Sequence, residues 1–210
     1  SIINDILDIT KIEAGKITVI PVEYDFSSII HDVTNMISFK AHAKSLDFHV
    51  CIDEKIPNRL LGDDIRIRQI LVNILNNAVK YTHEGSVTLE IGLLPCEEAE
   101  TALISFAVKD TGIGIKEEDI PKLFKPFERI EEKRNRSIEG TGLGMNITMQ
   151  LLGLMNSSLK VESVYGEGSV FSFVLKQKIL NPEPIGNLEK RIEERTKDSV
   201  YKKTFIAPKA

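Results

Sequence analysis

The chain has 210 residues, of which 42% are hydrophobic and 28% charged, so its composition is that of a soluble globular protein with one well-buried domain and extensions. The net charge of −4 argues against a nucleic-acid-binding surface. There is neither a run of roughly 18 apolar residues that would span a membrane nor a basic segment typical of a signal peptide. The two cysteines, Cys51 and Cys96, lie far apart and predict reduced thiols in a cytosolic protein.

The first sixteen residues, SIINDILDITKIEAGK, predict an amphipathic helix that ends at Gly15. Its apolar side chains recur at helical spacing and are Ile2, Ile3, Ile6, Leu7, Ile9 and Ile12. Neither an N-cap nor a first turn precedes them. We therefore expect this stripe to belong to a helical bundle formed with an upstream segment. Without that segment, we expect the stripe to be exposed and either frayed or paired with a second copy.

Hydrophobic periodicity and turn residues predict the remaining elements in chain order. The first half contains a strand over 17–24, a helix capped by Ser27 or Ser28 and ending near Ser45, a strand over 46–52, a connector over 56–63 and a long helix over 64–81. The second half contains strands over 86–94 and 102–110, a short helix over 117–121, a helix over 143–155 and a closing hairpin over 159–164 and 169–177. The chain from Asn181 onward is polar. Because helices and strands mix without strict alternation, we expect an α/β (α+β) two-layer sandwich, with helices on one face of a mixed sheet.

The long helix carries an unusual polar stripe. Leu71, Ile74, Leu75, Ala78 and Val79 form an apolar arc, and Asn73, Asn77 and Lys80 lie on the opposite side. Such a stripe is either a solvated face or a binding surface. Asparagine is a mediocre helix former, however, whereas its amide oxygen is a good ligand for Mg²⁺ and a lysine can meet a phosphate.

Two glycine-rich segments follow. In VKDTGIGI, Asp110 ends a strand, and Gly112 and Gly114 allow the backbone to turn or to approach a ligand closely. This is either a tight turn or a site where the carboxylate accepts a hydrogen bond from an exocyclic amine, as adenine offers. In EGTGLGMNI, Gly140, Gly142 and Gly144 come just before a helix, an arrangement that directs backbone N–H groups at an anion.

The segment between the two glycine-rich stretches reads LFKPFERIEEKRNRS. Phe124 and Phe127 are expected to anchor it, and Lys133, Arg134 and Arg136 lie on a loop that can close over phosphates.

Taken together and in this order, these elements resemble the ATP-binding domain of sensor histidine kinases, which shares a superfamily with DNA gyrase and the heat-shock chaperone ATPases. NILNNAVKYT resembles the N box, DTGIGI the G1 box, LFKPF the F box and GTGLGMNI the G2 box. The resemblance covers residues 1 to about 178. It implies a Bergerat-type fold, with ATP held between the helices under a mobile lid at roughly 128–141.

The resemblance also implies a role for each matching residue. Asn77 would coordinate Mg²⁺ with Asn73 nearby, Lys80 would contact phosphate, and Tyr81 would pack against the nucleotide. Asp110 would accept the adenine amine, with Ser169 assisting through a water. The base pocket would be lined by Gly112, Ile113 and Gly114, the phosphates would be cradled by Gly140, Thr141, Gly142, Leu143 and Gly144, and the lid would direct Arg134 or Arg136 at the γ-phosphate.

Asn73 distinguishes a kinase from an ATPase. In the ATPase branches a glutamate at this position activates water, whereas a neutral amide cannot act as a general base. We therefore expect ATP to be held without rapid hydrolysis, with Asn73, Lys80, Arg134 and Arg136 supporting transfer of its γ-phosphate to an external nucleophile. The alternatives are a gyrase-like ATPase module and a degenerate module that acts through protein contacts.

The resemblance divides the chain into three parts. Residues 1–16 would end a dimerisation and phosphotransfer hairpin, residues 17–180 would form the catalytic domain, and residues 181–210 would lead toward a receiver domain of a hybrid kinase. A disordered tail is the alternative for the last part. The sequence around His31, HDVTNM, departs from the phosphoacceptor motif. We therefore expect the acceptor histidine to lie on a dimerisation domain outside this chain, and this chain not to phosphorylate itself.

The expected partners are ATP with Mg²⁺, the dimerisation domain of a homodimer and a receiver domain. We expect neither nucleic acid nor membrane contact by this segment. The expected location is the cytoplasm, and the full-length protein can still be membrane-anchored.

Overall fold

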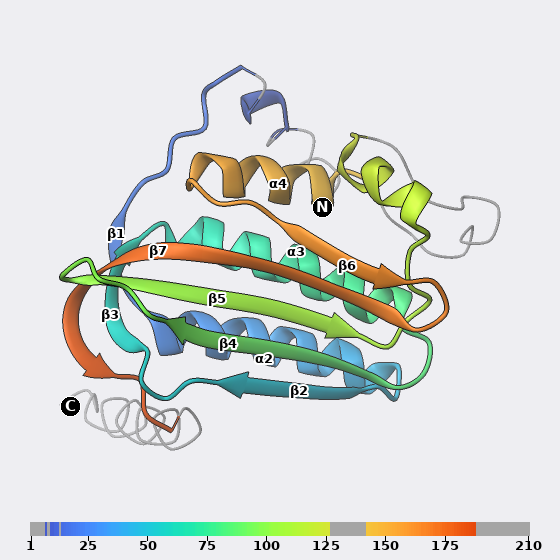
Figure 1. Cartoon of the computed structure of the whole chain (residues 1–210), viewed down its shortest axis with the longest axis horizontal. Coiled ribbons are helices and arrows are strands. Elements are labelled where there is room, and N and C mark those ends of the chain that lie inside the picture. The colour runs from blue at the N-terminus through green and yellow to red at the C-terminus, as the bar shows by residue number, and fades with distance from the viewer. Residues whose placement is uncertain (1–6, 8, 13, 127–141, 188–210) are drawn as a thin grey trace, which may run out of the picture.

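The computed structural model describes residues 7, 9–12, 14–126 and 142–187 of the chain. Their elements form two layers, a sheet and the helices α2, α3 and α4 that cover one of its faces (Figure 1). The predicted mixed sheet backed by helices is thus confirmed. Of the described helices, none is both long and apolar enough to cross a membrane.

The elements follow one another as β1 (Val22–Asp25), α2 (Phe26–Ala43), β2 (Asp47–Ile52), β3 (Pro57–Gly62), α3 (Asp64–Tyr81), β4 (Ser86–Leu94), β5 (Thr101–Asp110), the 3₁₀ helix η1 (Glu117–Phe124), α4 (Gly144–Leu154), β6 (Lys160–Val164) and β7 (Gly168–Pro184). In the described part of the chain, the strand order is β1-β3-β7-β5-β4-β2, with β6 paired to β7. Strands β2 and β4 are parallel, and the other pairs are antiparallel. The sheet is therefore mixed, as expected.

The hydrophobic core lies between the sheet and the helices. Strands β4, β5 and β7 alternate in burial along their length, and their buried apolar side chains form one cluster with those of the helices. Phe106 of β5 stacks on Phe173 of β7 with ring centroids 4.8 Å apart, and the ring centroids of Phe26 of α2 and Phe106 are 6.2 Å apart. The apolar arc predicted for the long helix is buried throughout: Leu71, Ile74, Leu75, Ala78 and Val79. Helix α3 is thereby fixed over the sheet with its polar side turned away from the core.

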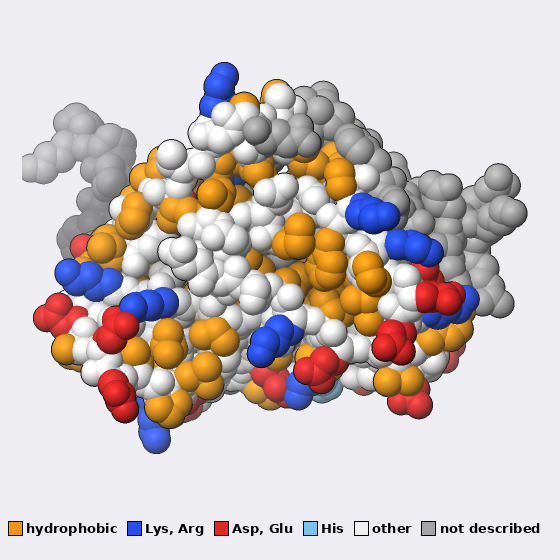
Figure 2. All heavy atoms as spheres, turned by 45° about the horizontal axis from the view of Figure 1, so that its top comes forward, with side chains coloured by type: hydrophobic (Ala, Val, Ile, Leu, Met, Phe, Trp, Pro, Cys, Tyr) orange, Lys and Arg blue, Asp and Glu red, His pale blue; other side chains and the backbone are white. Residues whose placement is uncertain are grey.

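The opposite face of the sheet carries charged side chains. Lys109 of β5 pairs with Glu90 of β4 at 2.6 Å, and Lys176 of β7 pairs with Glu98 at 2.6 Å. Acidic, basic and hydrophobic side chains lie interspersed on the surface seen in Figure 2. These exposed pairs contribute little stability, since water screens them.

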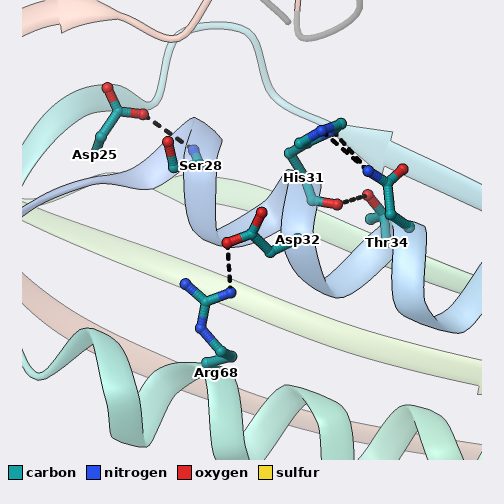
Figure 3. A network of polar contacts seen from close by, with 7 residues as sticks. Asp25, Ser28, His31, Asp32, Thr34 and Arg68 are labelled. Carbon is teal, nitrogen blue, oxygen red and sulfur yellow. Dashed lines mark hydrogen bonds and ion pairs between the residues drawn. The ribbon is translucent and has the colours of Figure 1, made fainter.

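Helix α2 begins earlier than the sequence suggested. The predicted caps were Ser27 and Ser28, but Asp25 is the N-cap, and its carboxylate accepts from the backbone N–H of Ser28 at 3.0 Å (Figure 3). Both serines instead lie in the first helical turn. Farther along, Asp32 pairs with Arg68 at 2.7 Å and links α2 to α3, whereas the His31 ring lies against Asn35 of its own helix.

Two predicted strand boundaries and one predicted connector were wrong. Strand β1 covers only Val22–Asp25 of the region expected to be extended from residue 17. Residues 57–62, predicted as a connector, form strand β3 between β1 and β7. Strand β7 continues to Pro184, well past the expected end at 177, because its second half pairs with β3. Ile185 is buried, and its N–H donates to the carbonyl of Ile56 at 2.7 Å.

The opening helix contradicts one expectation. Residues 9–12 are helical, and Ile9 is only 8% exposed as part of the apolar cluster, although we expected its stripe to be exposed. Ile12 packs partly against the same cluster, whereas Leu7 is 50% exposed. Part of this stripe is therefore covered by the domain itself. Residues 1–6, 8 and 13 lie outside the described residues, so the expected helical bundle stays a prediction.

A lysine ties the ends of α2 and α3 together. Lys44 follows α2, and its Nζ donates to the carbonyl oxygens of Val79, Lys80 and Thr82 at 2.7, 2.9 and 3.1 Å. The last carbonyls of a helix lack helical partners and carry partial negative charge, so a cation here is favourable. Partial burial lowers the pKa of the Lys44 ammonium.

We predict that Lys44→Met lowers the free energy of unfolding by about 1 kcal/mol, because it removes charged hydrogen bonds at a helix C-terminus. Urea denaturation measures this change. Lys178→Met, at an exposed position of β7, is the matched control. Equal stability of the two variants would contradict this role for Lys44.

Candidate nucleotide-binding site

Three segments separated in sequence converge at one end of the domain: the polar side of α3, the turn after β5 and the start of α4. Asn73 of α3 donates to the carbonyl oxygen of Gly144 at 3.3 Å, which joins α3 to α4. The backbone N–H of Ile113 donates to the carbonyl of Tyr81 at 3.2 Å, which joins the turn to the end of α3. The segments containing the N box, G1 box and G2 box therefore meet in space.

The asparagines of α3 do not all face the same way. Asn76 accepts a hydrogen bond from Lys40 of α2 at 2.6 Å, so its side chain is turned toward α2. Asn73 faces α4 instead, and Asn77 is half-buried one turn farther along α3. At the end of the helix, the Lys80 ammonium lies 4.8 Å from the centre of the Tyr81 ring. The polar stripe is therefore not one uniform surface, because Asn76 contacts α2 whereas Asn73 contacts α4.

The turn after β5 requires two glycines for different reasons. A Cβ atom on Gly112 would lie 2.5 Å from the carbonyl oxygen of Tyr81 and 2.8 Å from the carboxylate of Asp110. Gly114 has φ of +63°, and a Cβ there would clash with the backbone of Val164. The turn is therefore wedged between the end of α3 and the β6–β7 hairpin, and a side chain at either glycine would displace it.

Asp110 is the acidic group of this turn. It is half-buried at the end of β5, and its Oδ1 accepts from the N–H of Gly112 at 2.9 Å. Burial raises the pKa of the Asp110 carboxyl above its ordinary value of 3.8, whereas the backbone N–H groups of Gly112 and Ser169 act in the opposite direction. Among the described residues, no group of three His, Cys, Asp or Glu side chains could hold a metal. The Asp110 carboxylate thus accepts hydrogen bonds from backbone N–H groups.

Two serines continue the row of polar side chains that begins at Asp110 across the strands β7 and β6. Ser169 of β7 lies opposite Asp110 in strand register, and Ser163 of β6 lies opposite Ser169. The two hydroxyl oxygens are 2.9 Å apart. Ser169 is buried.

Helix α4 begins at Gly144, and no side chain of the described residues caps its N-terminus. Gly142 has φ of +71°, and Leu143, the N-cap residue, is buried. The first backbone N–H groups of a helix without a side-chain cap attract anions. The start of α4 thus suits a phosphate, as the glycine pattern predicts.

Some predicted site residues lie outside the described residues, namely Arg134, Arg136, Gly140 and Thr141, together with the predicted lid at 128–141 and the anchor Phe127. Asn146 was missed by sequence reasoning. It is buried, and its side-chain amide donates to the carbonyl of Phe124 at 2.7 Å, which holds η1 against α4. The signal available was a polar residue on the apolar side of the GTGLGMNI helix. Lys44 and Ser163 were also missed.

Residues 62–179 match the family described as histidine kinase-, DNA gyrase B- and HSP90-like ATPases. This match covers more than half of the chain. The chain belongs to this family.

The relatives are signalling kinases. The hybrid signal transduction histidine kinase L of Dictyostelium discoideum is 41% identical over 189 residues, which are 90% of this chain and 11% of that protein. The sensor protein GacS of Pseudomonas syringae pv. syringae is 38% identical over 176 residues, 84% of this chain and 19% of that protein. The chain thus spans a small part of these relatives.

The crystal structure of full-length ShkA in complex with AMPPNP is similar in fold. It has a TM-score of 0.72 and 27% identity over 86% of this chain and 36% of that chain. The likeness confirms that the two-layer domain has the architecture found in a nucleotide-bound protein.

Burial of Asp110 has a consequence for stability. Because its pKa is raised on folding, the folded state binds more protons than the unfolded state between pH 3.8 and the raised value. The cost of burying the ionised Asp110 carboxylate is absent below pH 3.8, where the carboxyl is protonated in both states. This cost lowers the free energy of unfolding as the pH rises through the raised pKa, and it is fully present at neutral pH.

We therefore predict that Asp110→Asn is more stable than the wild type at pH 7, and that this difference narrows as pH falls toward 4. Urea denaturation over this range measures it, with Asp47→Asn on the exposed face of β2 as the control for loss of a charge. A variant that is equally destabilised at every pH would contradict the assigned desolvation.

Proposed function

We propose that this chain is the ATP-binding catalytic domain of a histidine kinase, which passes the γ-phosphate of ATP to a histidine on a separate dimerisation domain. The observation that carries this proposal is the desolvated Asp110 carboxylate beside a glycine turn that is wedged between α3 and the β6–β7 hairpin. The kinase relatives and the nucleotide bound to ShkA support it.

The adenine would lie against the G1 turn. Asp110 would accept a hydrogen bond from the exocyclic amine, since its carboxylate is short of solvent. Gly112, Ile113 and Gly114 would line the base, because they follow Asp110 in the same turn and the Gly112 N–H donates to its carboxylate. Tyr81 would pack against the nucleotide.

The phosphates would lie between α3 and the start of α4. Gly142, Leu143 and Gly144 would direct the N–H groups of α4 at them, and Lys80 would add a positive charge. The Asn77 amide oxygen suits Mg²⁺, whose remaining ligands would be phosphate oxygens and water. Such an ion would neutralise phosphate charge. Gly140, Thr141, Arg134 and Arg136 stay predicted members of this site.

Asn73 favours transfer over hydrolysis. Its amide donates to the Gly144 carbonyl and has no basic lone pair, so it cannot remove a proton from water. In the proposed reaction, a nitrogen of the acceptor histidine forms a bond to the γ-phosphorus while the bond to the bridging oxygen breaks, and ADP leaves. The protein contributes mainly positioning and charge neutralisation.

The wider assembly is part of the proposal. Residues 1–16 would belong to the dimerisation hairpin of a homodimer, residues 17–180 to the catalytic domain and residues 181–210 to a linker toward a receiver domain. The histidine that accepts phosphate would lie outside this chain, which would therefore not phosphorylate itself. The domain would work in the cytoplasm.

We predict that the chain binds Mg-AMPPNP and that Asp110→Asn and Asn77→Ala each weaken binding at least about tenfold, because each removes a charged contact or a metal ligand. Isothermal titration calorimetry measures the affinities. Asn76→Ala is the matched control, since Asn76 is bound to Lys40, and its affinity should equal that of the wild type. Equal affinity in all four proteins would defeat the site assignment.

We also predict that the chain transfers labelled phosphate from ATP to a separately produced dimerisation domain, while hydrolysing ATP only slowly alone. Gel autoradiography and phosphate release measure the two reactions. Omitting the dimerisation domain is the control, and no label should appear on the chain itself. Rapid hydrolysis by the chain alone that is lost in Asn73→Ala would favour a gyrase-like ATPase instead.

A further inference from the structure

Asparagine side chains connect the start of α4 to two neighbouring elements. From α3, the Asn73 amide donates to the carbonyl oxygen of Gly144 at 3.3 Å. Toward η1, the Asn146 amide donates to the carbonyl oxygen of Phe124 at 2.7 Å. Asn146 lies two residues after Gly144, so both contacts act on the first turn of α4.

This turn carries the backbone N–H groups that the proposed function directs at phosphate. The first hydrogen bond of α4 runs from the Ile147 N–H to the Leu143 carbonyl at 2.9 Å. The N–H groups of Gly144, Met145 and Asn146 come before it, and within the described part of the chain they have no hydrogen-bond partner. Such groups bind an anion well only when their N–H bonds point at it, because a hydrogen bond weakens steeply as its angle at hydrogen decreases. The orientation of this turn therefore decides how well it can bind a phosphate.

Asn146 is a costly residue at this position unless its amide is used. It is only 6% exposed, and its neighbours Met145 and Ile147 are buried apolar side chains. A buried amide without a hydrogen bond costs free energy, and asparagine favours a helix less than leucine or methionine does. The contact with Phe124 satisfies the amide and also the carbonyl of the last residue of η1, which has no partner within a helix. Because this hydrogen bond is directional, it stabilises one position of α4 relative to η1.

We propose that the Asn146 side chain is a positioning group for the phosphates of the nucleotide: its hydrogen bond to Phe124 fixes the first turn of α4 so that the N–H groups of this turn point at phosphate. The inference rests on the proposed ATP site. The side chain acts through the orientation of α4 and is not assigned a contact with the nucleotide. Binding of the base should not depend on it, because the turn after β5 is held separately by the backbone contacts of Ile113 with Tyr81 and Gly166.

The test compares Mg-AMPPNP with adenosine, which has the base but no phosphate, as ligands of the full chain. We expect Asn146→Ala to raise the dissociation constant of Mg-AMPPNP about tenfold, the usual contribution of one hydrogen bond to a charged group, and to leave that of adenosine unchanged. Isothermal titration calorimetry measures the first constant and an amide NMR titration the second. The ratio of the two constants is a readout that a merely structural role would not change.

Ile147→Val is the matched control. Ile147 is the next residue of α4 and is buried, and the loss of one methylene group there weakens packing by about as much as the loss of one hydrogen bond. Urea denaturation should show similar losses of stability in the two variants, whereas Ile147→Val should bind both ligands as the wild type does. If Asn146→Ala does not fold, Asn146→Leu replaces it, since leucine has a similar shape but no hydrogen-bond donor.

The outcomes separate this inference from the proposed function. Equal weakening of both ligands by Asn146→Ala would mean that Asn146 only supports the domain, and would overturn the inference. Unchanged affinity of Asn146→Ala for Mg-AMPPNP would overturn it too, and so would an equal change of the ratio in Ile147→Val, because loosened packing rather than the hydrogen bond would then be the cause. Failure of the wild type to bind Mg-AMPPNP would instead contradict the ATP site itself, and this inference with it.

Discussion

The candidate site depends on how the turn after β5 is clamped. On one side the carbonyl of Tyr81 accepts from Ile113, and on the other the carbonyl of Ile113 accepts from Gly166 of the hairpin. These backbone bonds leave no room for a side chain at Gly112 or Gly114. Asp110 is consequently held between an α-helix and a hairpin, and the groups proposed to bind nucleotide take their positions from this clamp.

The clamp depends in turn on contacts from farther away. Helix α3 ends where Lys44 of α2 donates to its last carbonyls, so the position of Tyr81 depends on a residue 37 positions earlier in the sequence. On the hairpin side, Ser163 connects Ile115 to Gly168. The end of the domain that is proposed to bind the base is thus supported by polar contacts. The core around Phe106 holds the sheet against the helices.

The sequence was sufficient for elements whose signal is local. The long helix over 64–81 was predicted with its observed bounds, because its apolar arc is regular and Asp63 is a good N-cap. Strand β3 was missed, since Pro57 and Gly62 suggest a loop and only pairing with the distant strand β7 makes these residues extended. Lys44 was missed for the same reason, as no pattern within one segment reports a contact between two helices.

The order of the four sequence boxes predicted the candidate site better than any single box did. The structure joins the described parts of all four segments, since Asn146 of α4 also contacts Phe124, and the kinase relatives agree with the family resemblance. What the sequence did not predict is the direction of individual side chains. Asn76 and Asn77 are neighbours in one polar stripe, yet only the first is bound to α2. The three polar contacts of the Ser163 hydroxyl are likewise known only from the structure.

The central claim is that the clamped turn and the start of α4 bind one nucleotide together, and amide NMR of the chain titrated with Mg-AMPPNP tests it most directly. The account predicts that the backbone signals of Gly112, Gly114 and Gly144 and the side-chain amide of Asn77 all shift with a single dissociation constant, while the side-chain amide of Asn76 does not. Shifts confined to one of the two segments, or with different dissociation constants for each, would contradict it.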